Sequence, residues 1–221
     1  MANTNIKQII KQEYIKCAKD PVYFMKKYCY IQHPTRGRIQ FNLYPFQEKV
    51  LTLLNKNDRN IILKSRQLGI STLSAGISLW MMVFQKDKNI LVVATKQDTA
   101  KNLVTKVKFM YDNLPSWLQI GFVEKNKLAL RLKNGSQIKA VSAASDAGRS
   151  EAISLLIIDE AAFIEENRIE DIWASSQQTL STGGRAIVLS TPNGTGNFFH
   201  RMWVKAQENQ NGFVTIRLPW T

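Results

Sequence analysis

Four almost uninterrupted apolar runs constrain the fold of this chain more than any other feature. They occupy positions 61–63, 90–94, 155–158 and 187–190, and a fifth candidate follows at 213–218. Strands that are apolar on both faces are typical of a parallel sheet covered by helices on both sides. The segments Ser71–Phe84 and Asp98–Leu114 between these runs have the composition and periodicity of helices. The pattern predicts an α/β fold with a mostly parallel central sheet flanked by helices.

Shorter elements are expected before this sheet. Apolar residues recur at helical spacing in the first 20 positions, and Asp20-Pro21 reads as an N-cap followed by a proline at the first helical position. Residues 33–45 are expected to form a loop, and Phe46–Leu54 a helix. We therefore expect an N-terminal helical extension, residues 1–45, packed on a core formed by residues 46–221.

One β-hairpin is expected as an insertion in this core. Asn134-Gly135 separates the alternating segments 128–132 and 137–141. An Asn-Gly pair between two such segments is a strong hairpin signal.

Charge points to the kind of partner. The 221 residues carry a net charge of +13, although acidic residues outnumber basic ones after residue 150. Such an excess favours a polyanionic partner, and a solvated basic surface is the alternative. No apolar run approaches the ~18 residues of a membrane span, so no membrane partner is expected. The two cysteines and two histidines have no metal-ligand spacing.

A phosphate-binding loop is indicated where the first apolar run meets a helix. A strand, a loop and a helix N-terminus in this order present backbone N–H groups to an anion. Gly69 and Ser71 match the P-loop motif, whereas Lys64 replaces its first glycine and Ile70 its lysine. Lys64 and Arg66 are then the candidate cations, and a basic strand-to-helix turn is the alternative. The candidate loop consists of Lys64, Ser65, Arg66, Gln67, Leu68, Gly69, Ile70, Ser71 and Thr72.

Two adjacent carboxylates end the third apolar run. Asp159 and Glu160 follow Leu155–Ile158 directly, which is the Walker B pattern. A carboxylate at such a strand end holds Mg²⁺ together with the P-loop hydroxyl, here Ser71. Glu160 is the candidate base that activates water for attack on the terminal phosphate. A surface turn with two acids is the alternative.

Three further groups of residues are weaker candidates. Ser190-Thr191-Pro192-Asn193 follows a strand, where it could sense a terminal phosphate or form an ordinary turn. Phe46 and Gln47 could stack on and pair with a base, or begin a helix with a core aromatic. Arg149 beside Gly148 is a candidate arginine finger, or a surface or DNA-contacting residue.

Together these motifs resemble the ATPase domain of the terminase large subunits of phages and prophages, the DNA-packaging motors of tailed phages. The resemblance extends over nearly the whole chain and is most specific in Ser65–Gly69 paired with Asp159–Phe163. It implies a P-loop NTPase fold of the ASCE type. Many members carry a lysine where this chain has Ile70, and others carry it at the position of Lys64, to which we assign the phosphate role.

The resemblance also implies a role for each matching residue. It implies that Phe46 and Gln47 bind adenine, and that Arg66 binds the phosphates. It implies that Ser71 and Asp159 bind magnesium, and that Glu160 is the catalytic base. It further implies that Ser190, Thr191 and Pro192 couple hydrolysis to movement, and that Arg149 acts across subunits. The implied cofactors are therefore ATP and Mg²⁺.

The resemblance further implies a motor that drives double-stranded DNA into a procapsid. Its implied partners are the portal protein and the small terminase subunit, in a ring of subunits in the host cytoplasm. Family members also carry a C-terminal RNase H-type nuclease domain. Glu208 is the only acid after Asp171, so no nuclease activity is expected from this segment, and we expect it to be an excised ATPase domain.

DNA would be contacted by lysines without base specificity. The candidates are Lys101, Lys106, Lys108 and Lys125. Two other functions stay open: a helicase-type DNA-dependent ATPase, and a nucleotide- or DNA-binding module without turnover.

Overall fold

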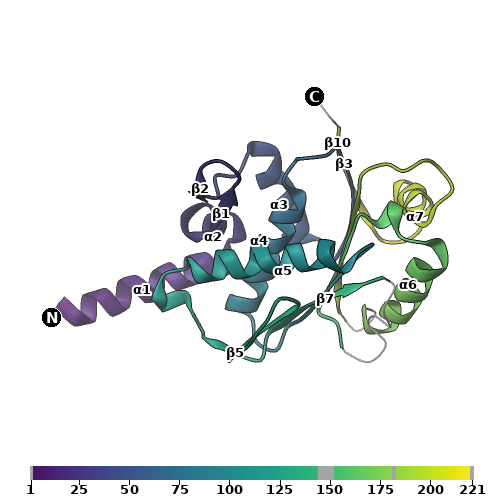
Figure 1. Cartoon of the computed structure of the whole chain (residues 1–221). Coiled ribbons are helices and arrows are strands. Elements are labelled where there is room, and N and C mark those ends of the chain that lie inside the picture. The colour runs from purple at the N-terminus through teal and green to yellow at the C-terminus, as the bar shows by residue number, and fades with distance from the viewer. Residues whose placement is uncertain (1, 144–151, 181–182, 220–221) are drawn as a thin grey trace.

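An eight-stranded sheet forms the centre of the molecule (Figure 1). The computed structural model describes residues 2–143, 152–180 and 183–219. The strands are β3 (Arg59–Lys64), β4 (Asn89–Ala94), β5 (Phe122–Lys125), β6 (Ala129–Leu132), β7 (Gln137–Ser142), β8 (Leu155–Asp159), β9 (Arg185–Ser190) and β10 (Val214–Leu218). Their order is β10-β3-β9-β8-β4-β7-β6-β5, and the pairs from β10 to β7 are all parallel. The predicted mostly parallel sheet is confirmed.

The central strands are apolar on both faces because both faces are covered. In β8, Leu155 and Ile157 belong to one buried cluster, whereas Leu156 and Ile158 belong to a second one on the opposite face. Since successive side chains of a strand point to opposite sides, an uninterrupted apolar run supplies both clusters at once.

Helices cover the two faces in two groups. The first cluster is built with α3 (Pro45–Lys56), α4 (Ile70–Phe84) and α5 (Gln97–Asp112), and the second with α6 (Glu166–Leu180) and α7 (Phe198–Gln207). Figure 1 shows α5 on one side of the sheet and α6 and α7 on the other. The helices predicted over α3, α4 and α5 are confirmed, whereas α6 and α7 were not predicted.

The N-terminal region contains more than helices. It consists of α1 (Ala2–Lys19), α2 (Pro21–Tyr28) and an antiparallel hairpin of β1 (Tyr30–His33) and β2 (Gly37–Gln40). The loop prediction for 33–45 is therefore wrong over β2. Short strands whose residues are half-exposed or exposed show no clear alternation of apolar and polar residues. In the turn between them, the Nδ1 atom of His33 accepts hydrogen bonds from two backbone N–H groups.

Two contacts fix the N-terminal helices. The Asp20 carboxylate accepts hydrogen bonds from the backbone N–H groups at the start of α2, which confirms the predicted cap. Glu13 of α1 accepts hydrogen bonds from Tyr23, Lys27 and Tyr28 of α2. These bonds, that from Lys27 first, lower the pKa of Glu13 to about 2. No helix among the described residues is long and apolar enough to span a membrane.

The predicted hairpin is confirmed as β6 and β7, which pair antiparallel. Its second strand also pairs in parallel with β4, so the hairpin is continuous with the central sheet. The unpredicted β5 adds a further antiparallel strand at the edge. Two short 3₁₀ helices, η1 (Ser116–Leu118) and η2 (Ala161–Phe163), complete the elements.

Candidate nucleotide-binding site

The carboxyl ends of three neighbouring strands meet at one edge of the sheet. Lys64 ends β3, Asp159 ends β8 and Ser190 ends β9. The strand register aligns Leu63 with Ser190, and Asp159 with Leu189. Open α/β sheets bind ligands at such an edge, and here it opens into a cavity of about 410 Å³.

The predicted phosphate loop lines this cavity. Its lining includes residues 66–72 together with Lys64, Glu160 and Lys106. Gly69 has a left-handed backbone, φ 72°, and caps α4, whose first N–H groups therefore begin at the cavity. Ser65 lies outside the lining and ties the start of the loop to β10, because its backbone N–H donates to the Leu218 carbonyl at 3.0 Å.

Gln47 of α3 holds this loop from behind. Its Nε2 donates to the Leu68 carbonyl oxygen at 3.0 Å, and its Oε1 accepts from the Tyr44 backbone N–H at 3.0 Å. A Cβ atom on Gly69 would lie only 2.7 Å from Nε2. The loop therefore needs glycine at position 69 both for its backbone angle and for the close approach of Gln47.

Ile70 stands where the P-loop motif has its lysine. Its side chain is 1% exposed and belongs to the apolar cluster of α3 and α4, so Ile70 lines the cavity without offering it a cation. Lys64 lies at the opposite end of the loop, and its Nζ is 2.9 Å from Oε1 of Glu160. The side chain of Lys64 is 8% exposed and that of Glu160 31%, which makes this a largely buried ion pair.

The predicted magnesium residues lie in contact. Oγ of Ser71 donates to Oδ2 of Asp159 at 2.8 Å. The other carboxylate oxygen, Oδ1, is buried and has no hydrogen-bond partner among the described residues. Burial raises the pKa of the Asp159 carboxyl, against the hydrogen bond from Ser71 and the charge of Lys64. A buried carboxylate oxygen without a partner, beside a hydroxyl, fits a hard divalent cation that takes oxygen ligands.

Glu160 is fixed through both of its carboxylate oxygens. Lys64 occupies Oε1, while the Thr191 hydroxyl donates to Oε2 at 3.2 Å. Its backbone adopts the left-handed region, φ 55° and ψ 44°. A non-glycine residue held there costs of order 1 kcal/mol, and the surrounding contacts maintain it. The carboxylate is thereby directed to the edge where the loop and Asp159 meet.

The segment after β9 is bonded to the turn that carries Glu160. The Ala162 backbone N–H donates to the Ser190 hydroxyl at 3.1 Å. The Asn193 side-chain amide donates to the Ala162 carbonyl at 2.9 Å. Together with Thr191, these contacts join the predicted coupling segment to the candidate base, whereas Pro192 is exposed.

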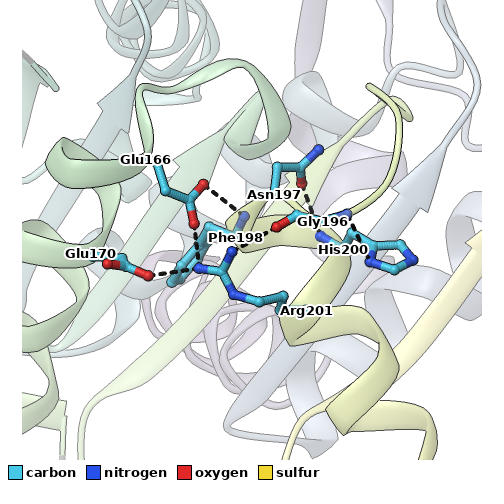
Figure 2. Close-up of polar contacts among 7 residues, drawn as sticks. All are labelled: Glu166, Glu170, Gly196, Asn197, Phe198, His200 and Arg201. Carbon is cyan, nitrogen blue, oxygen red and sulfur yellow. Dashed lines mark hydrogen bonds and ion pairs between the residues drawn. The ribbon is translucent and has the colours of Figure 1, made fainter.

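A second polar network continues from this segment to two helices (Figure 2). Arg201 of α7 donates to Glu166, to Glu170 at 2.6 Å and to the Gly196 carbonyl at 2.7 Å. Glu166 also accepts from the Phe198 backbone N–H at 3.0 Å. The network thus joins the N-terminal ends of α6 and α7, and it was not predicted from the sequence.

The predicted base-binding residues line a separate, wider cavity. It has a volume of about 750 Å³ and is lined by the β1–β2 hairpin and by Tyr44, Phe46, Gln47 and Gly69. The rings of Tyr44 and Phe46 stack at 5.9 Å. Gln47 is 4% exposed, and each half of its amide already has one partner. Within the described part of the chain, one N–H hydrogen and one lone pair of this amide remain for a ligand.

Comparison with known proteins identifies the family. A sequence model described as "Terminase large subunit, T4likevirus-type, N-terminal" matches residues 61–220. This chain belongs to the terminase large subunit family. The family expected from the motifs is confirmed.

Solved terminase structures have the same fold. The HK97 bacteriophage large terminase matches with a TM-score of 0.72 and 17% identity, over 91% of this chain and 43% of that chain. This terminase chain therefore spans less than half the length of that relative. The Thermus phage P74-26 large terminase ATPase domain matches with a TM-score of 0.65 and 18% identity, over 80% and 81%.

A third similar structure is the large terminase of a thermophilic bacteriophage in complex with ATP-gamma-S. Its TM-score is 0.61 at 15% identity, over 80% of this chain and 45% of that chain. At these identities the likeness concerns the fold, and it confirms the predicted P-loop NTPase architecture.

The remaining predicted residues are dispersed. Among the candidate DNA contacts, Lys101 lies 4.0 Å from Asp98, and Lys125 pairs with Asp112 at 2.9 Å. Lys108 is half-buried on α5. Lys106 lines the phosphate cavity, a position that sequence reasoning missed because the fold alone brings α5 to the loop. Arg149 lies outside the described residues.

Proposed function

We propose that this terminase chain hydrolyses ATP with Mg²⁺ and that hydrolysis drives double-stranded DNA translocation. The observation that carries the proposal is the geometry of Glu160. Its carboxylate is fixed by Lys64 at 2.9 Å and Thr191 at 3.2 Å, next to the Ser71–Asp159 pair. A purely binding site has no need of a carboxylate held at its phosphate end, since that charge repels phosphate.

Glu160 acts as the base that orients the attacking water. A proton acceptor must be held within hydrogen-bond reach of that water, and the two partners of Glu160 restrict its rotation. Phosphate oxygens compete with Glu160 for the ammonium group of Lys64. Nucleotide binding would therefore draw Lys64 toward the phosphates and leave Oε1 of Glu160 available to the water.

Asp159 and Ser71 hold the magnesium ion. Proteins usually bind this metal through one or two carboxylates plus the phosphates of the substrate, which matches the single buried carboxylate with an unused oxygen. When bound, Mg²⁺ neutralises charge on the β- and γ-phosphates. The loop N–H groups and Arg66 bind the same phosphates, and Phe46 with Gln47 binds the base.

The wider assignments rest on the family. We propose that Ser190–Asn193 couples the site to movement, that Arg149 completes the site of a neighbouring subunit, and that surface lysines such as Lys101, Lys108 and Lys125 contact DNA. The motor would work as a ring with the portal protein and small terminase subunit in the host cytoplasm. We further propose residues 46–221 as the ATPase core, residues 1–45 as its extension, and no nuclease activity from this segment.

The test measures Mg²⁺-dependent phosphate release by the 221-residue chain at rising protein concentration. Wild type should turn over, and Glu160→Gln should lose at least about 100-fold in rate while still binding ATP. Glu165→Gln is the matched control, since Glu165 is exposed five positions further on and should behave as wild type. ATP binding without turnover at any concentration would instead assign a binding module.

A further inference from the structure

A lysine outside every recognised motif reaches the phosphate cavity. Lys106 lies on α5, and Leu103 and Met110, at helical spacing on either side of it, are buried. Lys106 lines the cavity with Lys64, Ser71 and Glu160, and it also lines a neighbouring cavity beside β1. A long lysine stem packed along apolar neighbours with its ammonium in a polar cavity is a stable arrangement.

The charges of the cavity favour an anion. Among the described residues its lining contains three cations, Lys64, Arg66 and Lys106, and one carboxylate, Glu160. Lys64 is already paired with Glu160, whereas Lys106 has no ion pair within the described ranges. Burial lowers the pKa of Lys106. The negative charge of Asp159 raises this pKa, and the positive charge of Lys64 lowers it. A bound polyanion would offset both the burial of the ammonium group and its repulsion by Lys64.

The position of Lys106 places it near the phosphate end of a bound nucleotide and not near its base. The wider cavity with Phe46 and Gln47 is suited to the base. Lys106 instead shares a cavity with Lys64 and Glu160, at the end where hydrolysis takes place. The first N–H groups of α4 lie between the two cavities, since Gly69 lines both.

We propose that the ammonium group of Lys106 binds the terminal phosphate of the nucleotide and makes the site distinguish a triphosphate from a diphosphate. This inference rests on the proposed function and extends it to a residue on a different helix. Lys106 and Lys64 together then supply the positive charge that Ile70 cannot. Since α5 also carries Lys101 and Lys108, the contact would link the phosphate state directly to a helix with candidate DNA contacts.

The experiment compares the affinities of the 221-residue chain for ATP-gamma-S and ADP in the presence of Mg²⁺. Calorimetric titration is carried out on wild type, Lys106→Met, Lys106→Arg and the control Lys205→Met, an exposed lysine on α7. Lys106→Met should weaken ATP-gamma-S binding about tenfold or more, as expected for a lost charge-assisted hydrogen bond, and leave ADP binding within about twofold. Lys106→Arg should restore most of the preference, and Lys205→Met should equal wild type.

Two outcomes overturn the inference. If Lys106→Met binds both nucleotides as wild type does, Lys106 contacts no phosphate. If it weakens both equally, with its unfolding midpoint unchanged, the contact is not to the terminal phosphate. In either case, binding and turnover by the wild type would still support the proposed ATPase function. If the wild type binds neither ATP-gamma-S nor ADP, both this inference and the proposed function are wrong.

Discussion

Nζ of Lys64, the last residue of β3, lies 2.9 Å from Oε1 of Glu160, the residue after β8. The two partners differ in exposure, at 8% for the lysine side chain and 31% for the glutamate. Removing one partner of a buried pair is costly because the other charge stays behind. The cost therefore depends on which partner remains and on how well water reaches it.

This asymmetry makes the two single variants unequal. Glu160→Ala leaves the buried Lys64 ammonium unpaired and should lower the free energy of unfolding by about 2–3 kcal/mol. Lys64→Met leaves a partly solvated carboxylate that still has Thr191, and should cost less than about 1 kcal/mol. Urea unfolding at neutral pH measures both values. A larger loss in Lys64→Met than in Glu160→Ala would contradict the ion-pair account.

Thr191 should affect turnover more than binding. Its hydroxyl donates to Oε2 of Glu160 at 3.2 Å and its backbone N–H to the same oxygen at 3.4 Å, so Thr191→Val removes the shorter of these two hydrogen bonds to the candidate base. We expect kcat to fall about tenfold or more, with little change in KM, because positioning matters most in the transition state. Steady-state ATP hydrolysis measures the split between kcat and KM. Thr191→Ser keeps the hydroxyl and should recover most of the rate, and equal losses in both variants would argue against this role.

Substitution of Gly69 by alanine should cause both backbone strain and a steric clash, and Gly37 offers a control in which only the backbone strain is present. Gly69→Ala places a Cβ 2.7 Å from Nε2 of Gln47 at φ 72°, whereas Gly37→Ala has φ 66° and nothing within 4 Å. The control should lose only about 1 kcal/mol of stability for its left-handed backbone. Gly69→Ala should lose clearly more and also weaken ATP binding, since the Leu68–Gln47 contact must move. Denaturant unfolding and calorimetry check both, and equal stability losses would mean that the clash is absorbed.

The N-terminal helix should be held by a contact that fails in acid. The pKa of Glu13 in the folded chain is about 2, against 4.5 as its ordinary value. A lowered carboxyl pKa stabilises the fold above about pH 4.5, and this contribution is lost as the pH falls toward 2. Because the group lies near the surface, we expect about 1 kcal/mol.

The variant Glu13→Gln isolates this contribution. Wild type should be more stable than Glu13→Gln at pH 6, and the difference should shrink steadily between about pH 4.5 and pH 2. Thermal unfolding across this range measures the difference, with the exposed Glu165→Gln as the control. A difference that grows toward acid pH would have the wrong sign for a lowered pKa.

The central sheet was predictable because its signal is local. In β8 every residue is buried, so the run Leu155–Ile158 is apolar throughout and ends at Asp159. The P-loop and Walker B residues follow such strands directly, and the parallel sheet then aligns their ends. Proximity of Ser71 to Asp159 follows from the strand order, and the structure has their oxygens 2.8 Å apart.

Elements whose burial depends on distant partners were harder to predict. The helix α6 carries Ile169, Ile172, Trp173 and Leu180 at helical spacing, a signal that could have been found. By contrast β1 is mostly half-buried and β2 mostly exposed, so neither shows the burial pattern that would predict a strand. The approach of Lys106 to the phosphate cavity depends on the packing of α5, and no spacing in the sequence encodes it.

The alignment of Lys64, Asp159 and Ser190 has a consequence for the dynamics of the molecule. These residues end strands whose backbone amides lie in the middle of the sheet, and such amides usually exchange with solvent only during global unfolding. We therefore expect the candidate chemistry to sit on a slowly opening part of the chain. In the proposed motor, movement would then come from what is attached to this edge, such as the turn at Glu160 and the segment after β9, while the strands beneath stay closed.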